Sequence, residues 1–318
     1  MSLGKRIGIV AGALGALLLI GAVGLYLLLD RTLLKTSMRT PATPGWRDTL
    51  HAMGHLPDLT GLVLERTVDG DGSVMVYDST RWLPASSDVQ ALLAKLIVPS
   101  SGAALSSADT AQWREVASDT ALDRFVGLAR LRSWAAVSHA LPDDSTGIFA
   151  VRLPRYRGAR PPMDRLILRA LWRATHRDVP GARTDLAAVT SIGEQMFRRE
   201  ISIGLMQGVG VLGRAFRAYD MLAALTGDSA LARRIQPLSA WLQLKPGRVF
   251  QRIPSDSCAA VVADSSLPLG YRGLALEKMG GSIVRARWLL FGASNADLAS
   301  FAPFLQDRDP DIARYAAA

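Results

Sequence analysis

The hydrophobic positions of this chain follow the period of an α-helix over most of its second half. The clearest stripe has the spacing i, i+3, i+4, i+7, which places its side chains on one helix face. Its members are Met163, Leu166, Ile167, Ala170, Leu171 and Ala174, and its helix opens after Pro161-Pro162. The same pattern predicts helices over about residues 119–129, 184–225, 230–244, 280–295 and 297–305. Short turns, such as those at 178–181 and 227–229, separate them, so we expect a mainly α body of packed helical hairpins.

A different pattern precedes the helices. Residues 59–68 and 73–77 are rich in strand-forming residues, and the Asp-Gly-Asp-Gly sequence at 69–72 is typical of a hairpin turn. A calcium loop is the alternative for the two aspartates, but its twelfth position is Thr80 instead of an acidic ligand. We therefore expect a small β-hairpin in this part of the chain.

Residues 7–29 form an uncharged, apolar run. As a helix this run is about 34 Å long, enough to cross a hydrocarbon core of about 30 Å. It ends in the bulky sequence Tyr26-Leu27-Leu28-Leu29, so we interpret it as an uncleaved transmembrane anchor and not as a cleaved signal peptide. The predicted organisation is a cytoplasmic tail (1–6), the anchor (7–29), a juxtamembrane linker (30–58), the hairpin segment (59–100) and an α-helical domain (101–318).

The charges beside the anchor are nearly balanced, with Lys5 and Arg6 before it and Arg31, Lys35 and Arg39 after it. Long domains translocate largely regardless of charge, so we expect a single-pass protein of the bacterial inner membrane with its body in the periplasm.

Small residues recur along the anchor at i+4 intervals, at Gly4, Gly8, Gly12 and Ala16. They share one face of the helix, and small residues at this spacing allow another membrane helix to approach closely. Spans rich in Ala and Gly also show the pattern by chance. The functional interpretation is packing against the transmembrane helix of a partner.

Basic residues outnumber acidic ones, 37 to 28, and arginines concentrate around the helix at residue 163. Arg165, Arg169, Arg173 and Arg177 form a ladder at i+4 spacing, preceded by Arg155, Arg157 and Arg160. This field suits an acidic protein surface or anionic lipid headgroups, and a solvated helix face is the alternative. The anchor and the lack of interleaved aromatic residues argue against nucleic acid.

Candidate chemistry is sparse. One cysteine excludes an intramolecular disulfide framework and a cysteine-rich metal site, and no G-x-S-x-G or S-x-x-K motif occurs. His51 and His55 lie one helical turn apart and could face one metal, although a helix edge explains them as well. Gly208, Gly210 and Gly213 match the dinucleotide pattern G-x-G-x-x-G, but a helix-like sequence precedes them and Arg233 and Arg234 stand where an acidic residue belongs. We expect no catalytic, cofactor or metal site.

Three segments carry a resemblance to known proteins. The sequence Arg173-Ala-Thr-His-Arg-Asp-Val-Pro-Gly-Ala-Arg-Thr-Asp-Leu-Ala-Ala-Val, with Tyr219-Asp-Met-Leu and Arg287-Trp-Leu-Leu-Phe-Gly, resembles membrane-anchored helical-hairpin proteins of unknown function from high-GC bacteria. The resemblance implies an α-hairpin fold and no catalytic residue. The predicted helices show no exact period, so a tetratricopeptide-type repeat is only an analogy. Anchored helical bodies of this kind also resemble accessory subunits of bacterial photosynthetic reaction-centre–light-harvesting complexes.

These observations favour a non-catalytic structural or interaction subunit of a bacterial membrane complex. One alternative is a membrane-anchored extracytoplasmic enzyme, either a hydrolase or a metal-dependent one, with a site assembled from distant residues. The other is a ligand-binding module around Gly204–Gly213. A cleft with convergent titratable groups would favour the enzyme, and a flat apolar or basic patch would favour the subunit.

Overall fold

The computed structural model describes residues 42–73, 76, 86–97, 105–134, 159–200, 202–280, 302–308 and 312–313. This part of the chain is mainly helical, as the hydrophobic period predicts. Four long helices follow one another: α8 (Arg160–Thr175), α9 (Val179–Arg199), α10 (Ser202–Thr226) and α11 (Ser229–Gln243). The shorter helices are α2 (Trp46–Gly54), α4 (Ser87–Ile97), α5 (Ser107–Ala117), α6 (Leu122–Leu128), α12 (Cys258–Ala263) and α13 (Leu269–Gly280), with 3-10 turns η6 (Pro246–Gln251) and η7 (Ala302–Phe304).

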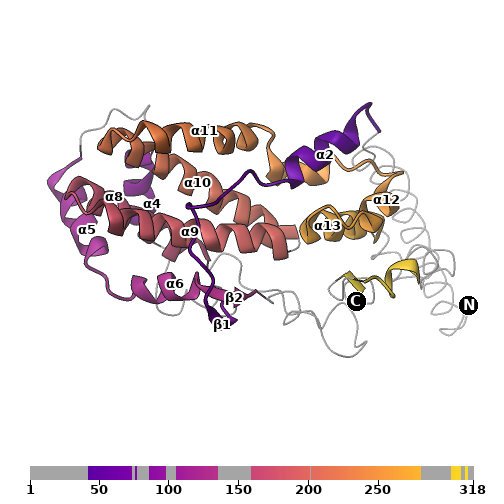
Figure 1. Cartoon of the computed structure of the whole chain (residues 1–318), viewed down its shortest axis with the longest axis horizontal. Coiled ribbons are helices and arrows are strands. Elements are labelled where there is room, and N and C mark those ends of the chain that lie inside the picture. The colour runs from indigo at the N-terminus through magenta and orange to yellow at the C-terminus, as the bar shows by residue number, and fades with distance from the viewer. Residues whose placement is uncertain are drawn as a thin grey trace, which may run out of the picture.

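The four long helices run back and forth beside one another (Figure 1). Helix α9 packs between α8 and α10, and α10 also contacts α8 and α11. The apolar stripe predicted on α8 faces this interior: Met163, Leu166 and Ile167 are fully buried. Near the C-terminal end of α9, the Phe197 ring makes edge contacts with Trp241 and Tyr271. These contacts join α9 to α11 and α13. The mainly helical body predicted from the sequence is confirmed.

Local capping explains where these helices begin and end. Arg177, with a left-handed φ of 67°, ends α8, and the Asp178 carboxylate accepts a hydrogen bond from the Gly181 amide at 2.9 Å to cap α9. In the next turn Gly227, with φ of 68°, ends α10, and Asp228 caps α11 by accepting from the Leu231 amide at 2.9 Å. Aspartate before a helix and a left-handed residue after one produce the short turns of the hairpins.

The helix predicted over residues 184–225 is two helices. Helix α9 already begins at Val179, and the chain is extended at Glu200, with φ of −101° and ψ of 157°. The Glu200 side chain is fully buried and accepts a hydrogen bond from the Trp134 indole nitrogen at 2.5 Å. Helix α13 also approaches closely there, since a Cβ atom at Gly270 would lie 2.5 Å from the Glu200 carbonyl oxygen. These contacts with distant segments favour the break, and a single-helix pattern cannot reveal them.

The predicted β-hairpin is wrong. Strand β1 (Val68–Asp71) pairs in parallel with β2 (Leu131–Ser133), from a distant part of the chain. After β1 the Asp71 carboxylate accepts from the Ser73 amide, and Val76 donates its amide to the Gly72 carbonyl, a helical turn in place of a returning strand. Residues 59–67 form an irregular segment whose Leu64 amide donates to the Ser191 hydroxyl of α9 at 2.8 Å. The alternating apolar residues of this segment cover the helices instead of forming a strand.

Several predicted features lie outside the described residues. They are the anchor at 7–29 with Gly4, Gly8, Gly12 and Ala16, the arginines Arg155 and Arg157, and the helix expected over 280–295 beyond its first residue. Within the described part of the chain, no helix combines the length and apolarity needed to cross a bilayer. The membrane anchor therefore stays a prediction from the sequence.

The start of α5 gives a prediction about pH. Ser106 and Asp109 form a reciprocal capping box, and Lys95 of α4 donates to both Asp109 oxygens at 2.8 and 2.9 Å. Lys95, followed by Ser106, holds the pKa of Asp109 at about 2. Because this pKa is below the unfolded value of about 3.9, the contribution to stability is present above pH 4 and is lost as the pH falls towards 2. A carboxyl NMR titration should find this pKa, and Asp109→Asn should remove the corresponding loss of helical signal. An Asp109 that titrates near its ordinary value would contradict this reading.

Candidate functional site

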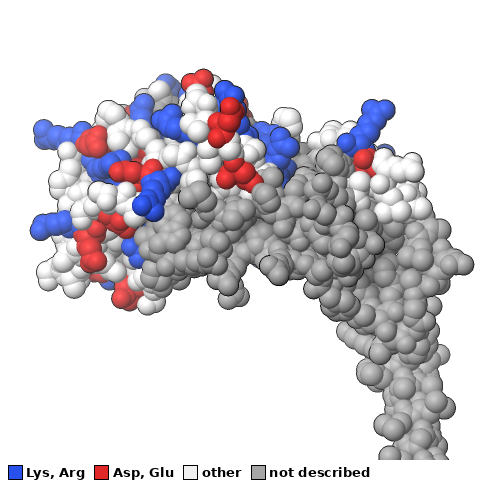
Figure 2. All heavy atoms as spheres, turned by 90° about the horizontal axis from the view of Figure 1, so that it is seen from below, with Lys and Arg blue, Asp and Glu red and all other residues white. Residues whose placement is uncertain are grey.

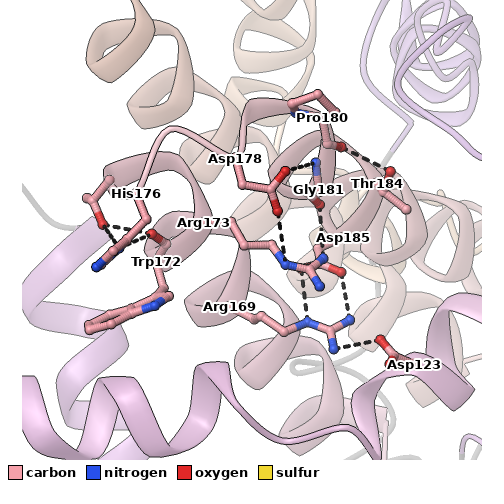
Figure 3. Close-up of polar contacts among 11 residues, drawn as sticks. Asp123, Arg169, Trp172, Arg173, His176, Asp178, Pro180, Gly181, Thr184 and Asp185 are labelled. Atoms are coloured by element: carbon pink, nitrogen blue, oxygen red, sulfur yellow. Dashed lines mark hydrogen bonds and ion pairs between the residues drawn. The ribbon is translucent and has the colours of Figure 1, made fainter.

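The arginine ladder of α8 does not form an open basic face. Arg169 is almost fully buried, and its guanidinium group makes a bidentate pair with Asp185 of α9, at 3.0 Å from Nε and 2.8 Å from Nη2 (Figure 3). Its Nη1 donates to Asp123 of α6 at 2.7 Å. Burial alone would lower the pKa of Arg169. Hydrogen bonds with the two carboxylates outweigh that effect and raise the pKa of Arg169 above its usual value. Arg169 is therefore a permanent cation inside the body.

One helical turn further, Arg173 completes this cluster. Its Nη1 donates to Asp185 at 2.9 Å and to the Gly181 carbonyl at 3.3 Å, and its Nε lies 3.6 Å from Asp178 (Figure 3). Asp185 is fully buried and accepts three hydrogen bonds from two guanidinium groups. Burial raises the pKa of Asp185, and the two arginines oppose that shift. The cluster ties α6, α8 and α9 together at the turn that Asp178 caps.

The other ladder residues differ in exposure. Arg165 lies 3.8 Å from Asp119 and exposes 18% of its side chain, whereas Arg160 is half exposed beside Asp164 of its own helix. Arg177 is exposed at the turn, and no ion pair involves it within the described residues. Acidic and basic side chains are interspersed on the face seen in Figure 2. A docking role stays a prediction for Arg177 and for Arg155 and Arg157, whereas Arg169 has no surface to offer a partner.

A second internal ion pair joins α8 to α10. Asp164 is 1% exposed, with one oxygen 2.8 Å from Arg214 Nε and the other 3.3 Å from Arg160 Nε. Burial raises the pKa of Asp164 and lowers the pKa of Arg214. Asp164 and Asp185 are thus the two fully buried aspartates of the described chain, and each faces two arginines. Sequence spacing reveals neither pair, because the partners come from different elements.

The glycines of the G-x-G-x-x-G pattern lie in the interior of α10. A Cβ atom at Gly208 would lie 2.7 Å from the Phe197 amide nitrogen and 2.9 Å from Met196 Cβ, both on α9. A dinucleotide site needs the glycines between a strand and a free helix N-terminus, which receives the pyrophosphate. Close packing of α9 on α10 accounts for Gly208.

The structure brings together one set of polar residues that the sequence analysis missed. His51 of α2 lies 3.1 Å from Asp264 through Nε2, and its Nδ1 lies 3.5 Å from the Ser266 hydroxyl. A cavity of about 220 Å³ adjoins them, lined by Trp46, Arg47, Leu50 and Leu267 among others. The Asp264-Ser-Ser266 sequence signals a turn, but nothing in the sequence connects it to His51.

This arrangement has the members of a catalytic triad without the required hydrogen bonds. The Ser266 hydroxyl donates to Asp264 at 2.5 Å, so its proton points away from the histidine that would have to remove it. The same bond, followed by the weaker effect of His51, lowers the pKa of Asp264. We interpret the cluster as a turn after α12 whose Asp264 contacts His51 of α2 at the surface.

The other candidate reactive groups among the described residues show no arrangement for metal binding or nucleophilic attack. Among the described residues, no three His, Cys, Asp or Glu side chains gather closely enough to hold a metal ion. The predicted companion of His51, His55, is exposed. Cys258 is buried, its thiol donates to the Pro254 carbonyl, and burial raises its pKa to about 11. A thiol with that pKa stays protonated at neutral pH and is a poor nucleophile.

A second cavity, of about 170 Å³, lies where α9 and α11 begin. It is lined by Arg183, Tyr219, Asp228 and Arg234 together with the loop at Gly61 and Leu62.

Comparisons of the chain with protein-family models, with curated proteins and with solved structures each found no match.

Proposed function

We propose that this protein is a non-catalytic structural or interaction subunit of a bacterial membrane complex. Its helical body lies on the periplasmic side, and one transmembrane helix, residues 7–29, holds it to the inner membrane. The observation that carries the proposal is the use of buried charge in the body. Asp164, Asp185 and Arg169 all engage in ion pairs that join neighbouring helices. Because these ion pairs fix the helices relative to one another, the body presents a rigid surface to a partner.

An enzyme would place its perturbed titratable groups differently. Active sites gather groups with shifted pKa values around a cavity that admits substrate. Here the two fully buried carboxyls whose pKa values burial raises, Asp164 and Asp185, line neither of the two cavities described above and are paired with arginines. Their role is to position helices, which supports the subunit proposal over the enzyme alternative.

The anchor provides the test. Gly8 and Gly12 share one face of the predicted helix, and leucine at both positions would separate it from a partner helix by the thickness of a side chain. We expect Gly8→Leu with Gly12→Leu to release the protein from its complex while the body stays folded. The measurement is the yield of co-purifying partners from membranes solubilised in mild detergent.

A matched control lies on the opposite face of the same predicted helix. Gly21→Leu with Gly24→Leu makes the same chemical change at 100° per residue roughly half a turn away from Gly8, and it should leave partner yield unchanged. Equal loss in both double variants would point to a general effect on membrane insertion. Full partner yield in the Gly8 and Gly12 variant would contradict packing through this face.

Ser266 is the strongest candidate nucleophile for the enzyme alternative. A fluorophosphonate probe reacts with a serine hydroxyl only when a base activates it, and the hydrogen bond to Asp264 opposes that. We expect no labelling of the full-length protein. Labelling that disappears in Ser266→Ala and in His51→Ala would replace the subunit proposal with a hydrolase.

A further inference from the structure

The cavity where α9 and α11 begin contains an excess of hydrogen-bond donors. Arg183 of α9 and Arg234 of α11 line it from two sides, with Tyr219 of α10 and the loop at Gly61 and Leu62. The Tyr219 ring is buried, and its hydroxyl donates to the Leu62 carbonyl at 3.3 Å. Both guanidinium groups act on the Tyr219 hydroxyl electrostatically, so their positive fields converge on this cavity.

The one carboxylate in the lining already has partners for both oxygens. One oxygen of Asp228 caps α11 by accepting from the Leu231 amide at 2.9 Å, and the other accepts from Arg183 Nη2. The cap, followed by the weaker pull of Arg183, lowers the pKa of Asp228 below its ordinary value. Asp228 is therefore a fixed anion, and most donors of the Arg183 guanidinium remain for another acceptor.

Arg234 forms no ion pair or hydrogen bond within the described residues. It extends over the loop at Gly61, where a Cβ atom would lie only 3.2 Å from Nη1 and the backbone has a left-handed φ of 73°. Hydrogen bonds with Thr60 are the main cause of the lowered pKa of the nearby Asp58. Asp58 attracts Arg234 only at longer range. Glycine at position 61 thus leaves room for the guanidinium at the rim of the cavity.

We propose that this cavity binds a carboxylate side chain of a partner protein, with Arg183 on one side of the carboxylate and Arg234 on the other. The proposal rests on the proposed function, since it names the chemistry of the partner. Two guanidinium groups with open donors match the acceptor oxygens of a carboxylate.

The size of the cavity favours a protein side chain over a free metabolite. Sites for small molecules usually enclose about 300–1,000 Å³ and bury most of the ligand. This cavity of about 170 Å³ is smaller, and Arg183 exposes 53% of its side chain at the edge. It therefore encloses a charged head group, while the rest of the partner lies outside.

The test uses the full-length protein in mild detergent and a fluorescently labelled hexaglutamate peptide as the probe. We expect Arg234→Gln to weaken peptide binding about tenfold, because one of the two charged donors is lost. Arg233→Gln is the matched control: it removes the same charge from the neighbouring exposed position of α11, which does not line the cavity. It should change the affinity less than twofold. Circular dichroism spectra of both variants should match that of the unmodified protein.

Three outcomes would overturn the proposal. Equal weakening by Arg233→Gln and Arg234→Gln would mean that only the general positive field binds the peptide. Unchanged binding in Arg234→Gln would place the peptide elsewhere. Full competition by acetate at the same concentration as peptide carboxylate would indicate a site for a free anion instead of a partner side chain.

The failure of this inference and of the proposed function can be told apart. If the peptide binds as expected but no protein co-purifies from membranes, the cavity assignment stands and the subunit proposal fails. If partners co-purify and Arg234→Gln changes neither their yield nor peptide binding, the subunit proposal stands and the cavity assignment fails.

Discussion

Replacing Asp185 with alanine should lower the free energy of unfolding by about 3–5 kcal/mol, because it leaves Arg169 charged and buried without its bidentate partner. Arg173 loses its shortest ion pair in the same substitution. Chemical denaturation of the full-length protein, followed by circular dichroism, measures the change. A loss below about 1 kcal/mol would mean that the cluster does not hold α8 and α9 together.

Two further variants separate the effect of burial from the effect of charge. Asp123 contacts the same arginine but exposes 66% of its side chain, so Asp123→Ala should cost about 1 kcal/mol or less. Replacing both members of the buried pair, with Arg169→Leu and Asp185→Leu, should recover much of the stability lost in Asp185→Ala. No recovery would indicate that shape at this turn matters more than the pairing of charge.

The second large effect concerns two glycines of α10 that lie two residues apart. Gly208→Ala should destabilise the body by about 1–3 kcal/mol, because the new Cβ atom would meet backbone atoms of α9. Gly210→Ala should stabilise it by about 0.5–1 kcal/mol, since only the Arg214 side chain lies near and alanine favours the helix. Thermal or chemical denaturation of the two variants gives the comparison.

The opposite signs distinguish helix packing from a nucleotide-binding loop. In a dinucleotide motif the first glycine permits a tight turn and the second lets the backbone approach the pyrophosphate, so neither substitution would be expected to stabilise the protein. If both alanine variants are equally stable, the close contact between α9 and α10 is not as described. If Gly210→Ala destabilises as strongly as Gly208→Ala, helix packing alone does not explain this segment.

Helices α8 and α11 of this protein follow from local information. The apolar stripe of α8 repeats with the helical period, and Asp178 and Asp228 stand where caps are expected. These signals depend on neighbours in the chain, and they predict the mainly helical body and its turns at 178–181 and 227–229 correctly.

The errors arise where distant segments decide the outcome. Val68 pairs with Leu131 instead of with a returning strand, and the burial of Glu200 against Trp134 ends a helix that its own sequence would continue. Strand pairing and burial of this kind depend on the tertiary fold, which a hydrophobic pattern does not specify.

The candidate site was least predictable for the same reason. The spacing of Arg165, Arg169 and Arg173 shows that they share a helix face, but their carboxylate partners come from α6, α9 and the turn before α6. Conversely, Arg183 and Arg234 belong to separate helices, and no motif connects them before the fold places them at one cavity. A row of arginines in a sequence predicts an exposed basic surface only where no carboxylate from another segment packs against it.

The most direct test of the subunit proposal is the composition of the particle that contains this protein in its own membranes. The full-length chain, tagged at its C-terminus and extracted in mild detergent, should migrate in a particle larger than the single chain in its detergent micelle. Mass spectrometry should find at least one other membrane protein in a fixed ratio to it. A chain that extracts alone, or that washes off the membrane in salt without detergent, would contradict the account.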